Sequence, residues 1–240
     1  TARGEWVWTT RSLEVPTEPC DGGGVTLPPR EGKVVLASLV RDDAVPNAGA
    51  TQVVVAPPAS PPDANEVRHD VRVLAVLGPY VFVEQTLYEY ACGAHGMTTK
   101  SFHVWDAERG APVEVLGALP GKRELYARAR ELLAEAEESA PPDDLEPTLT
   151  ALVPVWGGDG FRFEAQVTIE ACYACSDGLW SSYSRSARVE AAPPALLSRF
   201  ADAPPDVVAF ARRRADAEVG GFGRLRPGTT APGAGAAAHP

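Results

Sequence analysis

Four residues of this sequence have the types and the spacing that structural zinc sites use. Two residues separate Cys92 from His95, and two residues separate Cys172 from Cys175. Thiolates and imidazoles at this spacing hold Zn²⁺ in a tetrahedral site. The two pairs lie much further apart in the chain than the pairs of compact zinc modules. A zinc- or thiol-dependent enzyme that uses these four residues is one hypothesis for the function.

The cysteines are also candidates for disulfide bonds. The chain contains Cys20, Cys92, Cys172 and Cys175, and it begins with Thr1 rather than methionine. We expect that an upstream export signal, lipoprotein leader or membrane helix has been removed, which places the cysteines in an oxidising compartment. An even number of cysteines in such a compartment favours disulfides, and the sequence leaves three pairings open.

Other catalytic chemistry has little support in the sequence. A thioredoxin-type use of Cys172 would need a following helix to lower the pKa of its thiol, but the next residues are strand-like and broken by glycine. G-x-S-x-G, P-loop, G-x-G-x-x-G and H-E-x-x-H motifs do not occur. His69 and His103 lie within predicted strands and are expected to be structural. Among the histidines, His95 is the one placed to project from a turn.

The charge of the chain disfavours some classes of partner. Its 240 residues carry a formal net charge of −10 at pH 7. Nucleic acids and anionic membrane surfaces are bound by clustered lysine and arginine, so neither is an expected partner. No apolar run approaches the ~20 residues that a membrane-spanning helix needs. A positively charged partner is compatible, because opposite charges steer encounter.

Alternation of apolar and polar residues predicts a β-rich core. The segments 66–77 and 80–91, joined by Gly78-Pro79, have the pattern of a long antiparallel hairpin. A third strand is expected at 100–106. The alternation in the first strand of the hairpin predicts one face with Val67, His69, Val71, Val73, Ala75 and Leu77. Further strands are expected at 5–10, 33–40, 51–56, 151–156, 161–174 and 181–191, with a loop at 11–32.

Residues 122–138 predict the main helix. Their apolar stripe consists of Leu125, Ala129, Leu132, Leu133 and Ala136. Shorter helices are expected at 195–202 and 206–218. The predicted fold class is therefore α+β, with an antiparallel sheet, the 122–138 helix packed on one face, additional N-terminal strands and C-terminal helices.

Composition predicts three regions. Residues 1–62 hold strands and loops rich in proline and glycine, which are expected to pack on the main domain. Residues 63–218 are expected to form the α+β domain. Residues 219–240 are dominated by alanine, glycine and proline and predict a disordered tail.

Several features of residues 66–200 occur in a distinctive order. A strand ends in Tyr88-Glu89-Tyr90, and Gly93-Ala94-His95-Gly96 follows it. Next come an aromatic strand from Phe102 to Asp106, Gly110 and the 122–138 helix, and a closing strand and the segment ALLSRF complete the order. This order resembles a bacterial extracytoplasmic domain of unknown function. That domain occurs at the C-terminus of the lysozyme-sensing anti-sigma factor and beside the catalytic domain of peptidoglycan polysaccharide deacetylases.

The resemblance implies an exported, non-enzymatic binding or sensor module of the bacterial cell envelope, without a cofactor. It would be periplasmic or extracellular, and a lipid anchor on the removed N-terminal segment is one means of attachment. The implied binding residues are Tyr90, Gly93, His95 and Gly96. The anti-sigma relative binds lysozyme, a basic protein, and an acidic chain would suit such a partner. A cell-wall component is the other expected partner.

The cysteines depart from the family pattern, which usually has none before Gly-Ala-His. The presence of Cys92 there suggests an added cross-link between neighbouring strands, from Cys92 to Cys172 or Cys175. In relatives the histidine occurs without a metal partner, which disfavours zinc. A zinc ion on Cys92, His95, Cys172 and Cys175 is therefore the alternative to a disulfide-bonded module.

Overall fold

The computed structural model describes residues 6–22, 25–41, 51–59, 64–93, 95–157, 161–170, 180, 184–201, 205 and 209. The chain divides into two compact units, Thr1–Val113 and Glu114–Pro240. The strands of the first unit are β1 (Trp6–Glu14), β2 (Cys20–Gly22), β3 (Val25–Leu27), β4 (Gly32–Arg41), β5 (Thr51–Val55), β6 (Glu66–Leu77), β7 (Tyr80–Tyr90), β8 (Met97–Asp106) and β9 (Ala111–Val113). The second unit contains α1 (Lys122–Ala136), β10 (Pro147–Trp156), β11 (Phe161–Ile169), β12 (Arg185–Ala191) and the 3₁₀ helix η1 (Ser198–Phe200).

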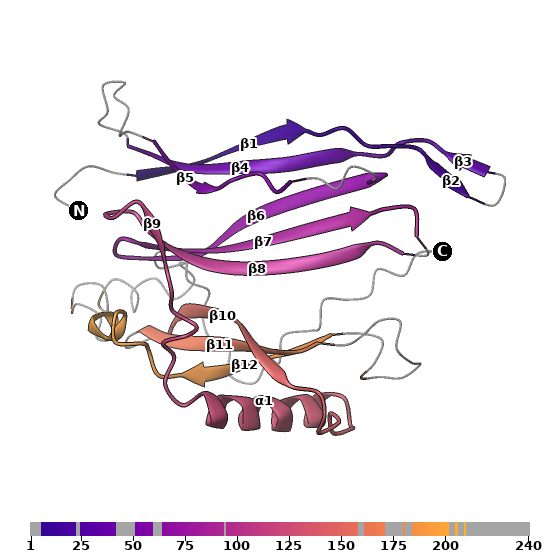
Figure 1. The fold of residues 1–240 in the computed structure, drawn as a ribbon. Helices are drawn as coiled ribbons and strands as arrows, with labels where there is room; N and C mark the ends of the chain where they lie inside the picture. The colour runs from indigo at the N-terminus through magenta and orange to yellow at the C-terminus, as the bar shows by residue number, and fades with distance from the viewer. Residues whose placement is uncertain are drawn as a thin grey trace. The chain divides into compact units, whose positions relative to one another are not determined.

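The main sheet of the first unit curls into a half-barrel (Figure 1). Its strand order is β1-β4-β6-β7-β8-β9, and β5 pairs with β4. The pairs are antiparallel except for β4 and β6, whose parallel pairing joins Gly32 to Val67 and Lys33 to Arg68. Over the rest of their length the described residues of β4 pair with β1 and β5 instead. The sheet therefore opens between β4 and β6. The short strands β2 and β3 form a separate hairpin.

The predicted hairpin is confirmed, because β6 pairs antiparallel with β7 around Gly78-Pro79. Gly78 has a φ of 60°, which glycine adopts without the steric penalty of a β-carbon. The third predicted strand is also present as β8, which begins earlier, at Met97.

The single apolar face predicted for β6 is wrong at its second half. A bulge lies between Val73, which pairs with Val83, and Ala75, which pairs with Phe82. Val83 and Phe82 point to opposite faces of β7, so Ala75 joins the face opposite to that of Val73. One extra residue, Leu74, is enough to exchange the faces for the remainder of the strand.

The core of the first unit lies on the inner face of the curled sheet. Buried Ala37 and Leu39 of β4 pack in one cluster with Val81 and Val83 of β7. A second cluster, of Val34, Ala64 and Val67, lies where β4 and β6 pair. Full burial of a valine or leucine side chain contributes about 1.5–3 kcal/mol, so these clusters hold the curl closed around its apolar face.

The second unit is a three-stranded antiparallel sheet with one helix. The strand order is β10-β11-β12, and α1 packs on β12 and β11. Gly121, with a φ of 66°, directly precedes the helix. The predicted stripe supplies its buried residues, Leu125, Ala129 and Leu133. Isolated helices of this length are marginal in water, so burial of the stripe stabilises α1.

The predicted α+β class is wrong, because the structure is mostly β with one α-helix among its described residues. We expected one antiparallel sheet with the 122–138 helix on its face. Instead, the strands of the long hairpin belong to the curled sheet of the first unit, and α1 covers the sheet of the second. An apolar stripe shows that a helix is buried on one side, but it does not specify which sheet buries it.

The predicted C-terminal helices are wrong for the described residues. Of the helix expected at 195–202, residues 195–197 form a turn and residues 198–200 form the 3₁₀ helix η1. Pro193-Pro194 precede this segment and Pro204-Pro205 follow it, which leaves too short a stretch for a helix to propagate. Residues 206–218 lie outside the described residues except for Ala209, and the predicted tail at 219–240 lies wholly outside them. Where the chain is described, no helix is long and apolar enough to cross a membrane.

Candidate functional site

Three of the four predicted binding residues lie in the connection between β7 and β8, whose described residues (91–93, 95 and 96) are referred to below as the Cys92 turn. β7 ends at Tyr90, and Cys92, Gly93, His95 and Gly96 follow. The side chains of Cys92 and His95 are exposed, and Gly96 is half-buried. Cys92 has a φ of 57°, a left-handed conformation that a residue with a β-carbon rarely adopts. The surrounding structure must therefore hold this strained turn in place.

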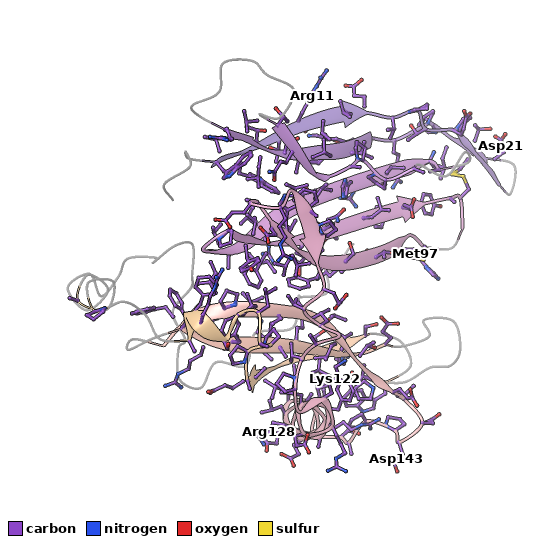
Figure 2. All side chains as sticks on the ribbon, turned by 60° about the vertical axis from the view of Figure 1, so that its left-hand side comes forward. Arg11, Asp21, Met97, Lys122, Arg128 and Asp143 are labelled. Carbon is purple, nitrogen blue, oxygen red and sulfur yellow. A yellow bond between two sulfur atoms is a disulfide. The ribbon has the colours of Figure 1, made fainter. Side chains whose placement is uncertain are left out.

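A disulfide bond provides a large part of that hold. Cys20 and Cys92 are bonded, with 5.3 Å between their Cα atoms and a sequence separation of 72. Figure 2 shows this bond beside the hairpin that carries Asp21. Cys20 is buried, with 4% of its surface exposed. The bond thus joins an exposed turn to a buried anchor on β2.

The expectation that Cys92 bonds Cys172 or Cys175 is wrong. Cys20 takes that place. Cys172 and Cys175 lie outside the described residues. The segment around Cys20 was expected to be a loop, and a loop gives no pairing register from which to place its cysteine opposite the turn.

Asn65 ties three segments together beside the disulfide. Its side chain is fully buried and donates hydrogen bonds from Nδ2 to the carbonyl oxygens of Glu18 (2.8 Å) and Pro28 (3.1 Å). Its backbone N–H donates to the carbonyl of Tyr90 at 2.7 Å, and its own carbonyl accepts from the N–H of Arg30 at 2.9 Å. A buried amide that satisfies loop carbonyls fixes those loops, because each unpaired group would cost about 1–3 kcal/mol. Sequence reasoning missed this residue.

Charged and aromatic side chains surround Glu66 on the face of the sheet next to the turn. The carboxylate of Glu66 binds Arg30 Nη1 at 3.2 Å and Arg68 Nε at 3.0 Å. The Arg68 guanidinium lies 4.5 Å from the centre of the Tyr88 ring, and that of Arg30 lies 5.9 Å from the Tyr90 ring. These five residues are named the Glu66 cluster. The arginines are more than half exposed, so each ion pair contributes at most about 1 kcal/mol.

Gly96 is required by its neighbour rather than by its own backbone angles. A β-carbon at this position would clash with Cζ and Oη of Tyr88. The phenol end of Tyr88 therefore occupies the space that any other residue would need. Gly93 differs, because among the described residues the nearest atom to a β-carbon there would be the His95 carbonyl oxygen, at 3.8 Å. Of the two predicted glycines, the structure assigns a packing role to Gly96.

The turn presents groups that suit binding. The imidazole of His95 is exposed, and its Nδ1 lies 3.3 Å from the carbonyl oxygen of Gly96. Met97, which begins β8, has 62% of its surface exposed. An imidazole and a thioether offer hydrogen bonding and apolar contact to a partner.

The predicted four-residue metal site cannot form with Cys92 in a disulfide. A metal ligand must be a thiolate, and a bonded sulfur has no thiolate to offer. The other two cysteines of the set lie outside the described residues. Within the described part of the chain, no group of three or more histidine, cysteine, aspartate or glutamate residues is arranged to hold a metal ion.

The other two strand histidines form a buried hydrogen-bonded chain. The N–H of Val35 donates to Nδ1 of His69 at 3.2 Å, and Nε2 of His69 lies 3.3 Å from Oε1 of Gln85. Nε2 of Gln85 lies 3.5 Å from Nδ1 of His103. Burial lowers the pKa of His103, and a backbone group of Val54 partly offsets this by raising it. The Val54 contact is not a well-formed hydrogen bond, since Nε2 of His103 has no partner of normal geometry among the described residues.

Comparisons with known proteins give little to add to this geometry. No protein-family model and no curated protein matches the chain. A solved structure that resembles it is a member of the DUF3298 family, a domain of unknown function, from Bacteroides fragilis. The TM-score is 0.37 and the identity is 10%, with 86% of this chain and 97% of that chain covered. The match does not bear on the anti-sigma or deacetylase setting implied by the sequence resemblance.

Removing the disulfide should destabilise the first unit. Replacing both Cys20 and Cys92 by serine should lower the free energy of unfolding by about 2–4 kcal/mol, because the bond restricts the unfolded chain over a long loop. Urea denaturation of the double variant and of both single variants would measure this. Each single variant should lose as much as the double variant, since either one breaks the same bond. Additive losses would contradict the pairing.

The two glycines of the turn should respond differently to alanine. Gly96→Ala should displace the Tyr88 ring from Arg68 and lower stability by about 1 kcal/mol. Gly93→Ala is the matched control and should stay within about 0.5 kcal/mol of the parent. Thermal unfolding and the NMR shifts of the Tyr88 ring would report both changes. Equal effects of the two substitutions would show that the ring does not pack on Gly96.

The half-buried His103 should make stability depend on pH. Because burial lowers its pKa in the folded state from the ordinary value of 6.5, the unfolded chain takes up the proton first as pH falls. The stabilisation is complete above pH 6.5 and declines below it, by at most about 1.4 kcal/mol per pH unit. His103→Gln should flatten this decline in denaturation curves between pH 7.5 and 5. An unchanged slope would mean that His103 is not the group responsible.

Proposed function

We propose that this chain is an extracytoplasmic binding module of the cell envelope and that the Cys92 turn is its contact surface. The observation that carries the proposal is the covalent fixation of an exposed, strained turn. The Cys20–Cys92 bond holds the turn at Cys92, and the Asn65 N–H holds the carbonyl of Tyr90 just before it, while Gly93 and His95 are exposed. Exposed loops on rigid scaffolds are common binding surfaces.

Fixing the turn before a partner arrives improves affinity. A mobile loop loses conformational entropy on binding, and a loop that is already ordered avoids most of that loss. The Glu66 cluster extends the surface from the turn onto the sheet, where it adds two tyrosine rings and two guanidinium groups. Tyrosine and arginine are enriched at the centres of protein interfaces.

The disulfide also supports the proposed compartment. Disulfides persist outside the cytoplasm and are rare where thiols are kept reduced. The Cys20–Cys92 bond is therefore consistent with an exported domain. Attachment through a lipid anchor is a further part of the proposal and depends on sequence before Thr1.

A basic protein is the proposed partner. The net charge of −10 favours association with a cation-rich surface, because long-range attraction raises the association rate. Two exposed arginines lie within the Glu66 cluster, so the contact itself is expected to be mixed in charge. Steering would come from the charge of the whole chain, and specificity would come from the turn.

A binding assay with a defined basic protein tests this proposal. Hen egg-white lysozyme would be the basic probe, ovalbumin the acidic control and purified peptidoglycan sacculi the cell-wall arm. We expect lysozyme to bind, more weakly at high salt, and ovalbumin not to bind. Calorimetry would measure the binding of the two proteins, and co-sedimentation would measure the binding of the sacculi. Binding of sacculi alone, or of none of the three, would overturn the proposed partner.

Uncharged substitutions separate a specific contact from general attraction. Tyr90→Ala combined with His95→Ala leaves the formal charge of the chain unchanged and should weaken lysozyme binding by at least about ten-fold. Tyr126→Ala is the matched control, because this half-buried tyrosine lies on α1 in the second unit. Equal binding by both variants would move the contact away from the Cys92 turn.

A further inference from the structure

The opening in the curled sheet begins at His69. Past the pairing of Lys33 with Arg68, the N–H of Val35 on β4 donates to Nδ1 of His69 on β6, at 3.2 Å. The His69 side chain therefore accepts the hydrogen bond that a backbone carbonyl of β6 would accept if the two strands stayed paired. The imidazole of His69 thus marks the end of the backbone pairing, and β4 and β6 diverge beyond it (Figure 1).

An apolar pocket of about 300 Å³ lies in this opening. Trp6 and Trp8 of β1 and Leu39 of β4 form one wall. Trp8 pairs with Leu39 in the ladder, so the indole and the leucine share a face of the sheet. The remaining lining residues are Val73, Val76, Gly78, Pro79, Val81, Ala107 and Glu108.

The bulge in β6 builds the second wall. Without an extra residue, Val73 and Val76 would point to opposite faces of the strand. The bulge at Leu74 pairs Val73 with Val83 and Val76 with Val81, which are both on the inner face of β7. Val76 remains 44% exposed at the pocket although its neighbours are buried. The open apolar wall is therefore a consequence of a specific irregularity in the strand.

One charged side chain belongs to the lining. Glu108 follows β8 in the turn before β9, and its carboxylate makes no ion pair with any described residue. Its position is fixed locally, because its backbone N–H donates to Oδ1 of Asp106 at 2.9 Å. The Trp6 ring already attracts a cation, since the Arg41 guanidinium lies 5.9 Å from its centre. The pocket lining therefore combines indole rings with a carboxylate that no described residue neutralises in an ion pair.

We propose that this pocket binds a small organic cation with an apolar body, such as an alkylammonium. The apolar walls would bury the body, and the cation would lie between an indole face and the Glu108 carboxylate. A carboxylate or phosphate head group would be repelled by Glu108. This site shares no residue with the Cys92 turn, so either proposal can fail without the other.

A head-group series tests the charge preference. Hexyltrimethylammonium, 1-hexanol and hexanoate have the same alkyl chain and differ in charge, and calorimetry or saturation-transfer NMR would measure their binding. We expect the ammonium to bind at least about ten-fold more tightly than hexanoate, with hexanol between them. Equal binding of ammonium and hexanoate, or no saturable binding of any probe, would overturn the proposal.

Variants locate the site. Glu108→Gln should reduce the preference for the ammonium over the alcohol, because only the indole contribution remains, while leaving hexanol binding unchanged. Val76→Ala should weaken ammonium binding about five-fold through lost apolar contact. Val53→Ala is the matched control, because Val53 is similarly exposed (48%) and does not line the pocket. Equal losses in the two valine variants would place the binding elsewhere.

A peptide probe distinguishes a free small molecule from a protein side chain. A blocked tripeptide with central lysine presents the same kind of cation on a polypeptide. We expect it to bind less tightly than hexyltrimethylammonium, because the peptide backbone has no place among the apolar lining residues. Tighter binding of the peptide would overturn the assignment to a small molecule.

Discussion

The bond between Cys20 and Cys92 is the constraint on which the candidate site depends. It closes a long loop, so that β2 and the Cys92 turn lie together although most of the first unit separates them in sequence. The strained backbone of Cys92 persists because this bond holds Cys92 itself and the N–H of Asn65 holds the carbonyl of Tyr90 before it. Without them, the turn would be free to relax to conformations that a β-carbon prefers.

The second organising feature is the incomplete pairing of β4 with β6. Where these strands pair, Val34 and Val67 form a closed core beside the disulfide. Where they diverge, beyond the hydrogen bond from Val35 to His69, the inner face opens into the tryptophan-lined pocket. One sheet therefore offers two different surfaces, a polar turn at its covalently fixed end and an apolar pocket at its open end. The buried chain through Gln85 and His103 stabilises the strands that carry both.

Local patterns in the sequence predicted the long hairpin, the strand at 100–106 and the start of the main helix at Lys122, because each depends on periodicity and turn residues. The helix ends at Ala136, two residues before the predicted limit. These local patterns did not predict features that depend on contacts between distant parts of the chain. Continuing the pairing of Leu77 with Tyr80 without a bulge would place Tyr88 opposite His69, whereas the bulge brings Arg68 there and creates the cation–π pair. Alternation does not reveal a bulge at Leu74, and no local signal showed that Cys20 would reach the turn.

Peptide mapping under non-reducing conditions tests the central claim most directly. Trypsin separates the cysteines into peptides 12–30, 73–100 and 163–185, which hold Cys20, Cys92 and the remaining pair, respectively. The account predicts a cross-linked species of peptides 12–30 and 73–100 in the mass spectrum, which separates on reduction. Peptide 73–100 joined to 163–185 would contradict it, and so would an unlinked 73–100 with a free thiol, because the Cys92 turn would then lack its anchor.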